Sequence, residues 1–139
     1  MGLKLGDKTI LAIDDEPEVL DLIKEFLESQ YYRVLTATSG PEGLKLLKKE
    51  KPHLILLDIR MPKMGGFEVL SELKKNPETA SIPVVMLTAR METEMIHKAK
   101  QLGAVDYIVK PFHPDDLLKW IKVYERYDQP KPHDPNLKN

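Results

Sequence analysis

The sequence lacks cysteine and any long hydrophobic run. With no cysteine among 139 residues, disulfide bridges and thiolate metal sites are excluded. No apolar stretch approaches the roughly 20 residues that a membrane-spanning helix needs, and no long apolar segment stands near the N-terminus. We therefore expect no membrane span and no membrane partner, and a cytoplasmic location is the default expectation.

An excess of one charge is also missing, as is a glycine-rich phosphate loop. The formal net charge is −1 at pH 7, which creates neither a basic field for nucleic acid nor a polybasic anchor. The chain contains no Walker sequence (GxxxxGK followed by Ser or Thr), so a nucleotide is not the obvious phosphate donor. We expect no direct contact with nucleic acid.

The chain does contain enough apolar sequence for one domain. Its hydrophobic content of 42% is ordinary for a globular protein, and a chain of this length can bury about two-thirds of its unfolded surface. Residues 128–139 hold three prolines and a single apolar side chain. We therefore predict one domain over residues 1–127 and a flexible, proline-rich tail over residues 128–139.

Five short apolar runs alternate with five segments of helical pattern. Runs rich in Ile, Val and Leu are typical of buried parallel strands, which we predict at Thr9–Asp14, Tyr32–Ala37, Leu54–Asp58, Ile82–Thr88 and Val105–Val109. The patterns between and after them predict helices at Pro17–Ser29, Pro41–Lys49, Gly66–Lys75, Glu92–Leu102 and Pro114–Tyr127. A helix after each strand implies right-handed crossovers and an α/β three-layer sandwich with a five-stranded parallel sheet.

Four of the predicted strands end in polar side chains. These are Asp14 with Asp15, then Asp58, Thr88 and Lys110, after the first, third, fourth and fifth strands. The carboxyl ends of parallel strands lie on one edge of a sheet, where ligands bind. We therefore expect three carboxylates, a hydroxyl and an ammonium to converge on one small site.

Such a site suits phosphoryl transfer. Three crowded carboxylates repel one another, so positive charge has to compensate; Lys110 supplies one charge and a divalent cation is the natural second. Mg²⁺ prefers a few carboxylates together with waters and a phosphate oxygen. Phosphoryl transfer needs this kind of charge neutralisation, and a carboxylate can be the nucleophile that forms an aspartyl phosphate.

Each of these residues also has a simpler interpretation. Asp14 and Asp15 could cap the first helix, and Asp58 could be an ordinary turn residue. Thr88 could be a helix cap and Lys110 a surface lysine. Taken singly, these interpretations are at least as common as a functional role. Four coincidences at four strand ends are improbable together, which favours a shared site.

Motifs at these strand ends resemble those of a known family. The chain resembles the response-regulator receiver domain, the phosphoacceptor module of two-component signalling, in AIDDEP at 12–17, LLDIRMPKMGGF at 56–67, LTA at 87–89 and DYIVKPF at 106–112. The resemblance covers about residues 8–127. It implies a flavodoxin-like, doubly wound (βα)5 fold with sheet order 2-1-3-4-5.

The resemblance assigns roles by matching position. Asp58 is the expected phosphoacceptor, and the side chains of Asp15 and Asp58 are expected to bind Mg²⁺. Asp14 would hold a metal-bound water, and the backbone carbonyl of Arg60 would complete the metal site. Lys110 would contact the phosphoryl oxygens.

The resemblance also assigns a switch. Thr88 would hydrogen-bond a phosphoryl oxygen after transfer, and the small Ala89 would leave room for the group. Tyr107 matches the aromatic switch position. The bond from Lys110 to Pro111 is expected to be a cis peptide, which X–Pro bonds tolerate.

The resemblance implies a signalling protein and not an enzyme that converts a separate substrate. The chain would accept a phosphoryl group from the phosphohistidine of a histidine kinase or histidine phosphotransfer protein, promoting only its own phosphotransfer and autodephosphorylation. Phosphorylation would shift a conformational population. A downstream output protein or domain would bind the face made by the fourth helix, fifth strand and fifth helix. We expect a monomer or a phosphorylation-dependent dimer.

Other functional classes compete with this one. A receiver that is a fragment of a larger hybrid kinase or transcriptional regulator stays open as the alternative. A Mg²⁺-dependent phosphohydrolase with an Asp nucleophile usually has a second acid two residues later, where Arg60 stands. A flavin carrier is disfavoured because an acidic strand end would repel the flavin phosphate.

Two features near the predicted site each allow two interpretations. Arg60 and Arg90 either shield the acyl phosphate from water or are ordinary surface arginines. Trp120 lies beside the apolar stripe of the last helix, where it is either partly buried or part of an exposed apolar patch for a partner, together with Met91, Met95 and Tyr107.

Overall fold

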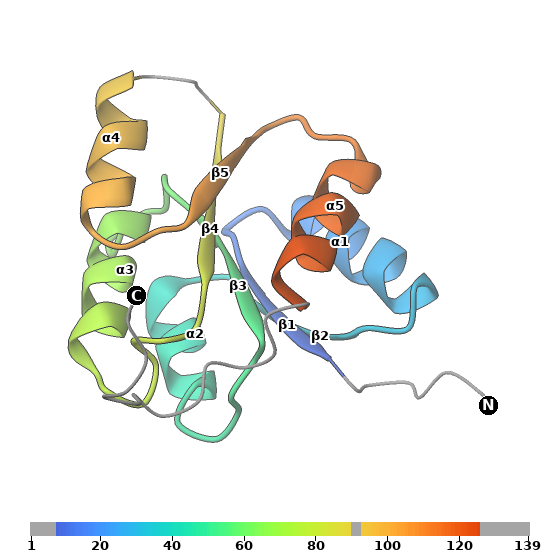
Figure 1. Ribbon diagram of the computed structural model, residues 1–139, viewed down its shortest axis with the longest axis horizontal. Coiled ribbons are helices and arrows are strands. Elements are labelled where there is room, and N and C mark those ends of the chain that lie inside the picture. The colour runs from blue at the N-terminus through green and yellow to red at the C-terminus, as the bar shows by residue number, and fades with distance from the viewer. Residues whose placement is uncertain (1–7, 90–92, 126–139) are drawn as a thin grey trace, which may run out of the picture.

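Five parallel strands alternate with five helices in the computed structural model, which describes residues 8–89 and 93–125 (Figure 1). The strands are β1 (Thr9–Ile13), β2 (Arg33–Ala37), β3 (Leu54–Asp58), β4 (Val84–Thr88) and β5 (Asp106–Val109). The helices are α1 (Pro17–Ser29), α2 (Gly40–Leu46), α3 (Gly66–Lys75), α4 (Thr93–Gln101) and α5 (Pro114–Glu125). The sheet order is β2-β1-β3-β4-β5, and all neighbouring pairs are parallel. The predicted doubly wound α/β fold is confirmed.

Several element boundaries differ from the predicted ones for local reasons. Strand β4 begins at Val84 and not at Ile82, because Pro83 has no N–H for the ladder and the Ile82 N–H bonds within the preceding turn. Helix α2 ends at Leu46 and not at Lys49, because the N–H groups of Lys48 and Lys49 bond three residues back, to the carbonyls of Lys45 and Leu46, and tighten the last turn.

The sheet has a hydrophobic core on each face. Leu11 and Ile13 of β1 pack into the core beneath α2, α3 and α4, whereas Ile10 and Ala12 pack into the core beneath α1 and α5 (Figure 1). Every residue of β1, β3 and β4 is buried. Burial on both faces explains why these strands are unbroken apolar runs in the sequence.

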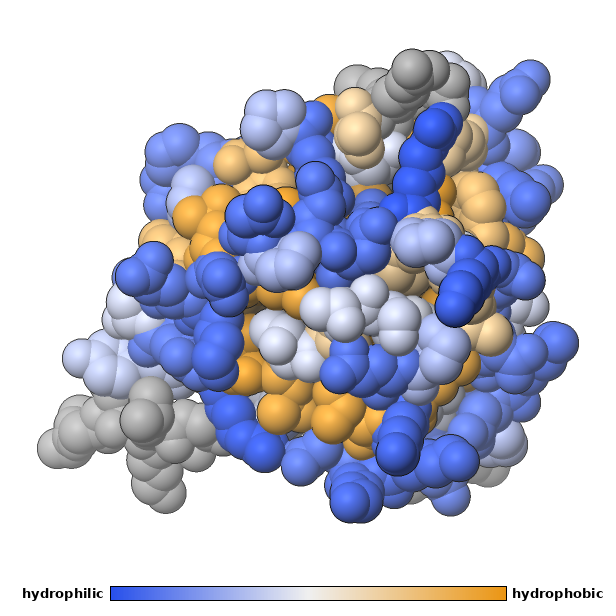
Figure 2. All heavy atoms as spheres, turned by 180° about the vertical axis from the view of Figure 1, so that it is seen from behind, coloured by the Kyte–Doolittle hydropathy of each residue, from blue (hydrophilic) through white to orange (hydrophobic). Residues whose placement is uncertain are grey.

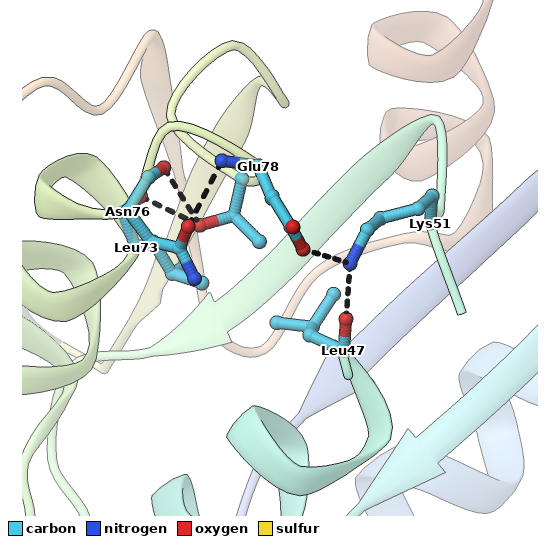
Figure 3. Close-up of polar contacts among 6 residues, drawn as sticks. Leu47, Lys51, Leu73, Asn76 and Glu78 are labelled. Atoms are coloured by element: carbon cyan, nitrogen blue, oxygen red, sulfur yellow. Dashed lines mark hydrogen bonds and ion pairs between the residues drawn. The ribbon is translucent and has the colours of Figure 1, made fainter. Parts of the chain in front are cut away.

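The edge of the sheet at which the strands begin is closed by loop contacts (Figure 3). Thr79 is 3% exposed, and its hydroxyl donates to the Leu73 carbonyl at 2.7 Å. Lys51 lies between the Leu47 carbonyl, to which it donates, and the Glu78 carboxylate at 3.5 Å. These contacts hold the ends of α2 and α3 together, away from the strand ends that carry the polar side chains.

The surface mixes polar and apolar side chains. Figure 2 shows hydrophilic side chains over much of the rear face, with apolar atoms exposed in separate patches between them.

Among residues 8–89 and 93–125, no helix is long and apolar enough to cross a membrane. The predicted helix limits at Glu92 and Tyr127 and the predicted tail at 128–139 lie outside the described residues.

Candidate functional site

Three aspartates meet where β1 and β3 end. Asp58 is the last residue of β3 and is 4% exposed, and Asp14 follows β1 and is fully buried. Asp15 is partly exposed. One carboxylate oxygen from each residue lies within 4.8 Å of the others. The predicted convergence of these three side chains is confirmed.

Lys110 meets the aspartates from the end of β5. Its Nζ lies 2.7 Å from Asp14 Oδ2, 3.1 Å from Glu16 Oε1 and 3.4 Å from Asp58 Oδ1. Its backbone N–H donates to the Thr88 carbonyl at 2.7 Å, and its bond to Pro111 is cis, as predicted. Lys110 is therefore held through both its backbone and its side chain at the edge that carries the aspartates.

The second oxygen of Asp14 is incompletely satisfied. Asp14 Oδ1 accepts the Glu16 N–H at 2.9 Å, but the buried Oδ2 has no aligned hydrogen bond among the described residues. Its contact with Lys110 at 2.7 Å is an ion pair that lacks hydrogen-bond geometry. A buried carboxylate oxygen of this kind, beside two other aspartates, fits a hard cation. The three aspartates are able to hold a divalent metal ion.

Charge at this edge is not balanced by the protein alone. Burial raises the pKa of Asp58 to about 7, helped by the charge of Asp14, while Lys110 and a backbone hydrogen bond from Arg60 oppose the rise. Burial lowers the pKa of Lys110, but its close contact with the Asp14 carboxylate and the negative charges of Asp58 and Asp14 outweigh burial and leave the pKa of Lys110 above its usual value. The site therefore favours further positive charge.

Thr88 and Arg60 also lie at this edge. Thr88 is the last residue of β4 and is 2% exposed, and β4 pairs with β3 through Asp58 and Leu87. Arg60 is exposed two residues beyond Asp58. Arg90, its predicted companion in shielding the site, lies outside the described residues.

Tyr107 and Trp120 are both half-buried. Tyr107 is on β5 and packs against the core beneath α2, α3 and α4, as does Met95, whereas Trp120 packs against the opposite core. The Trp120 ring stacks on Tyr124 with 6.2 Å between ring centroids. Tyr107 and Trp120 line a common hollow of about 330 Å³. Trp120 is therefore partly buried and shares a hollow with Tyr107 between β5 and α5, and Met91 lies outside the described residues.

Glu16 is a site residue that spacing and periodicity did not indicate. It stands inside the AIDDEP segment, and its carboxylate reaches Lys110 from the start of α1. A contact between two residues so far apart in the sequence leaves no local pattern that could have identified it.

Residues 10–122 match the model of the response regulator receiver domain. The chain belongs to the response regulator receiver domain family. All of the strand-end residues above lie within the matched part of this receiver.

Curated relatives include proteins of different lengths. PilH from Pseudomonas aeruginosa is 39% identical over 115 residues, which cover 82% of this receiver and 94% of PilH. The alkaline phosphatase synthesis transcriptional regulatory protein PhoP from Bacillus subtilis is 37% identical over 133 residues, covering 96% of the receiver and 55% of PhoP. A probable cyclic di-GMP phosphodiesterase from Vibrio cholerae is 43% identical over 107 residues, covering 77% of the receiver and 24% of that protein. The receiver thus spans a quarter to half of the length of several relatives it matches.

Solved structures share the whole architecture. The chemotaxis protein CheY4 from Vibrio cholerae has a TM-score of 0.81 at 32% identity, covering 84% of this receiver and 98% of CheY4. A CheY-like receiver from Methanospirillum hungatei has a TM-score of 0.79 at 36% identity, covering 87% and 94% of the two chains. The family and fold predicted from the sequence are confirmed.

Proposed function

We propose that this receiver accepts a phosphoryl group on the carboxylate of Asp58. The observation that carries the proposal is the placement of this buried side chain, 3.4 Å from the Lys110 ammonium and within a group of three aspartates. Membership of the receiver family and the relationship to PilH and PhoP support the same role.

The donor in this proposal is the phosphohistidine of a histidine kinase or histidine phosphotransfer protein. An Asp58 oxygen forms a bond to phosphorus as the bond from phosphorus to the imidazole nitrogen breaks. The imidazole leaves with the electron pair of that bond, as a neutral ring when its second nitrogen carries a proton. The Lys110 ammonium, which already faces Asp58, neutralises charge on the transferred oxygens.

The cofactor in this proposal is Mg²⁺. The side chains of Asp15 and Asp58 and the backbone carbonyl of Arg60 would bind the ion directly, and Asp14 would hold it through a water. When bound, the ion supplies positive charge to the phosphoryl oxygens. The clustered aspartate oxygens and the incompletely satisfied Asp14 Oδ2 support this assignment.

Signalling would follow from a switch that involves Thr88 and Tyr107, which lie on neighbouring strands. A phosphoryl group on Asp58 adds negative charge and strong hydrogen-bond acceptors, which attract the Thr88 hydroxyl. Movement of Thr88 gives the half-buried Tyr107 ring room to turn inward, and the population of the two states shifts. An output protein or domain would then bind at α4, β5 and α5.

The receiver would signal by contact and catalyse only its own phosphotransfer and autodephosphorylation. It would act as a monomer or as a phosphorylation-dependent dimer. It would work either largely alone, as its 94% coverage of PilH suggests, or within a longer regulator or hybrid kinase, as its 55% coverage of PhoP suggests.

Incubation with acetyl phosphate and Mg²⁺, followed by intact-protein mass spectrometry, tests the acceptor. We expect the wild type and Asp21→Asn, which alters an exposed α1 residue, to gain one phosphoryl group, and Asp58→Asn to gain none. Equal labelling of Asp58→Asn would show that Asp58 is not the acceptor.

A further inference from the structure

Glu16 occupies the N-cap position of α1 without capping the helix. Its backbone is extended (φ −99°, ψ 107°), and its side chain makes no capping hydrogen bond within the described chain. N-cap positions favour Ser, Thr, Asp and Asn, whose short side chains accept hydrogen bonds from the first turn. The longer Glu16 side chain instead places a carboxylate oxygen 3.1 Å from Lys110 Nζ, in a hydrogen bond and ion pair.

Glu16 is the solvent-side member of three carboxylates around Lys110. An ammonium has three N–H donors, and Asp14, Glu16 and Asp58 lie 2.7, 3.1 and 3.4 Å from it. The side chains of Asp14 and Asp58 are 0% and 5% exposed, whereas that of Glu16 is 58% exposed. Glu16 is thus the carboxylate of this group that is most open to a phosphoryl group arriving from the solvent.

Glu16 also differs from the two aspartates in its relation to a metal. Asp14 and Asp58 belong to the aspartate group that could hold a cation, and Glu16 does not. A metal ion bound by these residues would compensate the charge of the aspartates and leave the Glu16 carboxylate facing Lys110.

We propose that Glu16 is a positioning residue that holds the Lys110 ammonium away from the phosphoryl group. This inference rests on the proposed phosphorylation of Asp58. The Glu16 carboxylate competes with phosphoryl oxygens for the N–H donors of Lys110 and repels the same anionic group. It therefore stabilises the unphosphorylated receiver relative to the phosphorylated one and slows phosphoryl transfer.

The alternative role for Glu16 is to affect only the stability of α1 from the N-cap position, and a serine at this position separates the two roles. Glu16→Ser removes the contact with Lys110 but introduces a favoured N-cap, so it raises the urea midpoint of unfolding. Glu16→Gln removes the charge without introducing such a cap. If Glu16 acts only through helix stability, the two variants differ in their affinity for a phosphoryl analogue. If it acts through Lys110, both variants change that affinity alike.

The experiment compares the wild type, E16Q, E16S and the control Glu18→Gln, which removes a carboxylate from the exposed first turn of the same helix. The first measurement is the Kd for beryllofluoride with Mg²⁺, followed by NMR; this group activates the structurally similar DrrB receiver domain. The second is the initial phosphorylation rate with acetyl phosphate and with phosphoramidate. The third is the urea midpoint.

We expect E16Q and E16S to bind beryllofluoride about two- to fivefold more tightly than the wild type, in keeping with the loss of one partly exposed ion pair. Their phosphorylation rates should rise by a similar factor with both donors, because the effect acts through Lys110 and not through the charge of the donor. E18Q should stay within about twofold of the wild type, since charges far from the site are screened.

Affinities of E16Q and E16S within twofold of the wild type, weaker binding, or affinities that follow the urea midpoint would overturn the inference about Glu16 while leaving Asp58 as the acceptor. A wild-type protein that neither gains a phosphoryl group nor binds beryllofluoride would overturn the proposed function, and this inference with it.

Discussion

Gly66 begins helix α3 directly against the backbone of Asp58. The Gly66 N–H donates to the Ile59 carbonyl at 2.8 Å, and a Cβ atom on Gly66 would collide with the Asp58 carbonyl oxygen. At the preceding position, Gly65, the nearest atom to such a Cβ would be the Ile59 carbonyl oxygen at an ordinary 3.6 Å. The end of the strand that carries Asp58 is thus set by an approach that glycine alone permits.

Gly66→Ala should lower the free energy of unfolding by at least about 2 kcal/mol, because backbone and not a flexible side chain must move to admit the methyl group. It should also slow phosphorylation, since that movement displaces Asp58. Gly65→Ala is the matched control and should lose less than about 1 kcal/mol. Urea unfolding gives both values, and equal midpoints for the two variants would contradict the prediction.

The raised pKa of Asp58 predicts a specific pH dependence of stability. The carboxyl has a reference pKa of 3.8 and titrates near 7 in the folded chain. Below pH 3.8 it is protonated in both states, so its favourable contribution is fully present. Between these values only the folded chain keeps the proton, and the contribution is lost as the pH rises through 7.

Asp58→Asn cannot titrate at this position and should therefore become more stable than the wild type as the pH rises. With EDTA present, the difference in unfolding free energy should grow from near zero at about pH 4 to about 1–3 kcal/mol at about pH 8. Urea titrations across this range measure it, with Asp21→Asn as the control for an exposed carboxylate. A difference that stays constant with pH would argue against an unfavourable buried charge at Asp58.

Magnesium should stabilise the folded receiver through the three aspartates. The gain in unfolding free energy follows the ligand concentration relative to Kd, so the thermal midpoint should rise with added Mg²⁺ and return on chelation. Asp15→Asn should weaken Mg²⁺ binding at least about tenfold, equivalent to about 1.4 kcal/mol. Asp15 is the partly exposed member, so its substitution disturbs the core least. Glu18→Gln, outside the group, should respond to Mg²⁺ like the wild type; equal responses from all three proteins would count against an aspartate site.

The Thr79 hydroxyl should matter for stability and not for phosphorylation. It donates to the Leu73 carbonyl, which Pro77 cannot satisfy because proline has no N–H. Thr79→Val leaves that buried carbonyl without this donor and should cost about 1–3 kcal/mol. Thr79→Ser keeps the hydroxyl and should lose less. Phosphorylation rates of both should match the wild type, because Thr79 lies at the opposite edge of the sheet; a slower rate in a folded Val variant would link the two edges.

The alternation of strands and helices could be predicted because the central strands are buried on both faces. Strand β3 is buried at every position, so its sequence is a continuous apolar run. The first and last residues of the strands and helices were harder to predict from the sequence. The start of β4 depends on which N–H groups join the ladder and which join the preceding turn, and that competition is settled only in the folded chain.

The position of Trp120 illustrates a second limit. Helical spacing placed it beside the apolar stripe of α5, where either a buried or an exposed ring fits the pattern. Stacking on Tyr124 and partial contact with the core leave it half-buried. The degree of burial depends on side-chain rotamers and neighbouring helices, which periodicity does not describe.

By itself, the sequence determined the fold class and the set of strand-end residues that share one site. The pattern of apolar residues and the position of a residue at the end of a strand are local properties of the sequence, and parallel strands bring their carboxyl ends to a common edge. Only the tertiary structure decided that Glu16 contacts Lys110 in place of capping its own helix, and that Gly66 lies against Asp58. Both relationships depend on distances between packed segments, and no spacing along the chain encodes such distances.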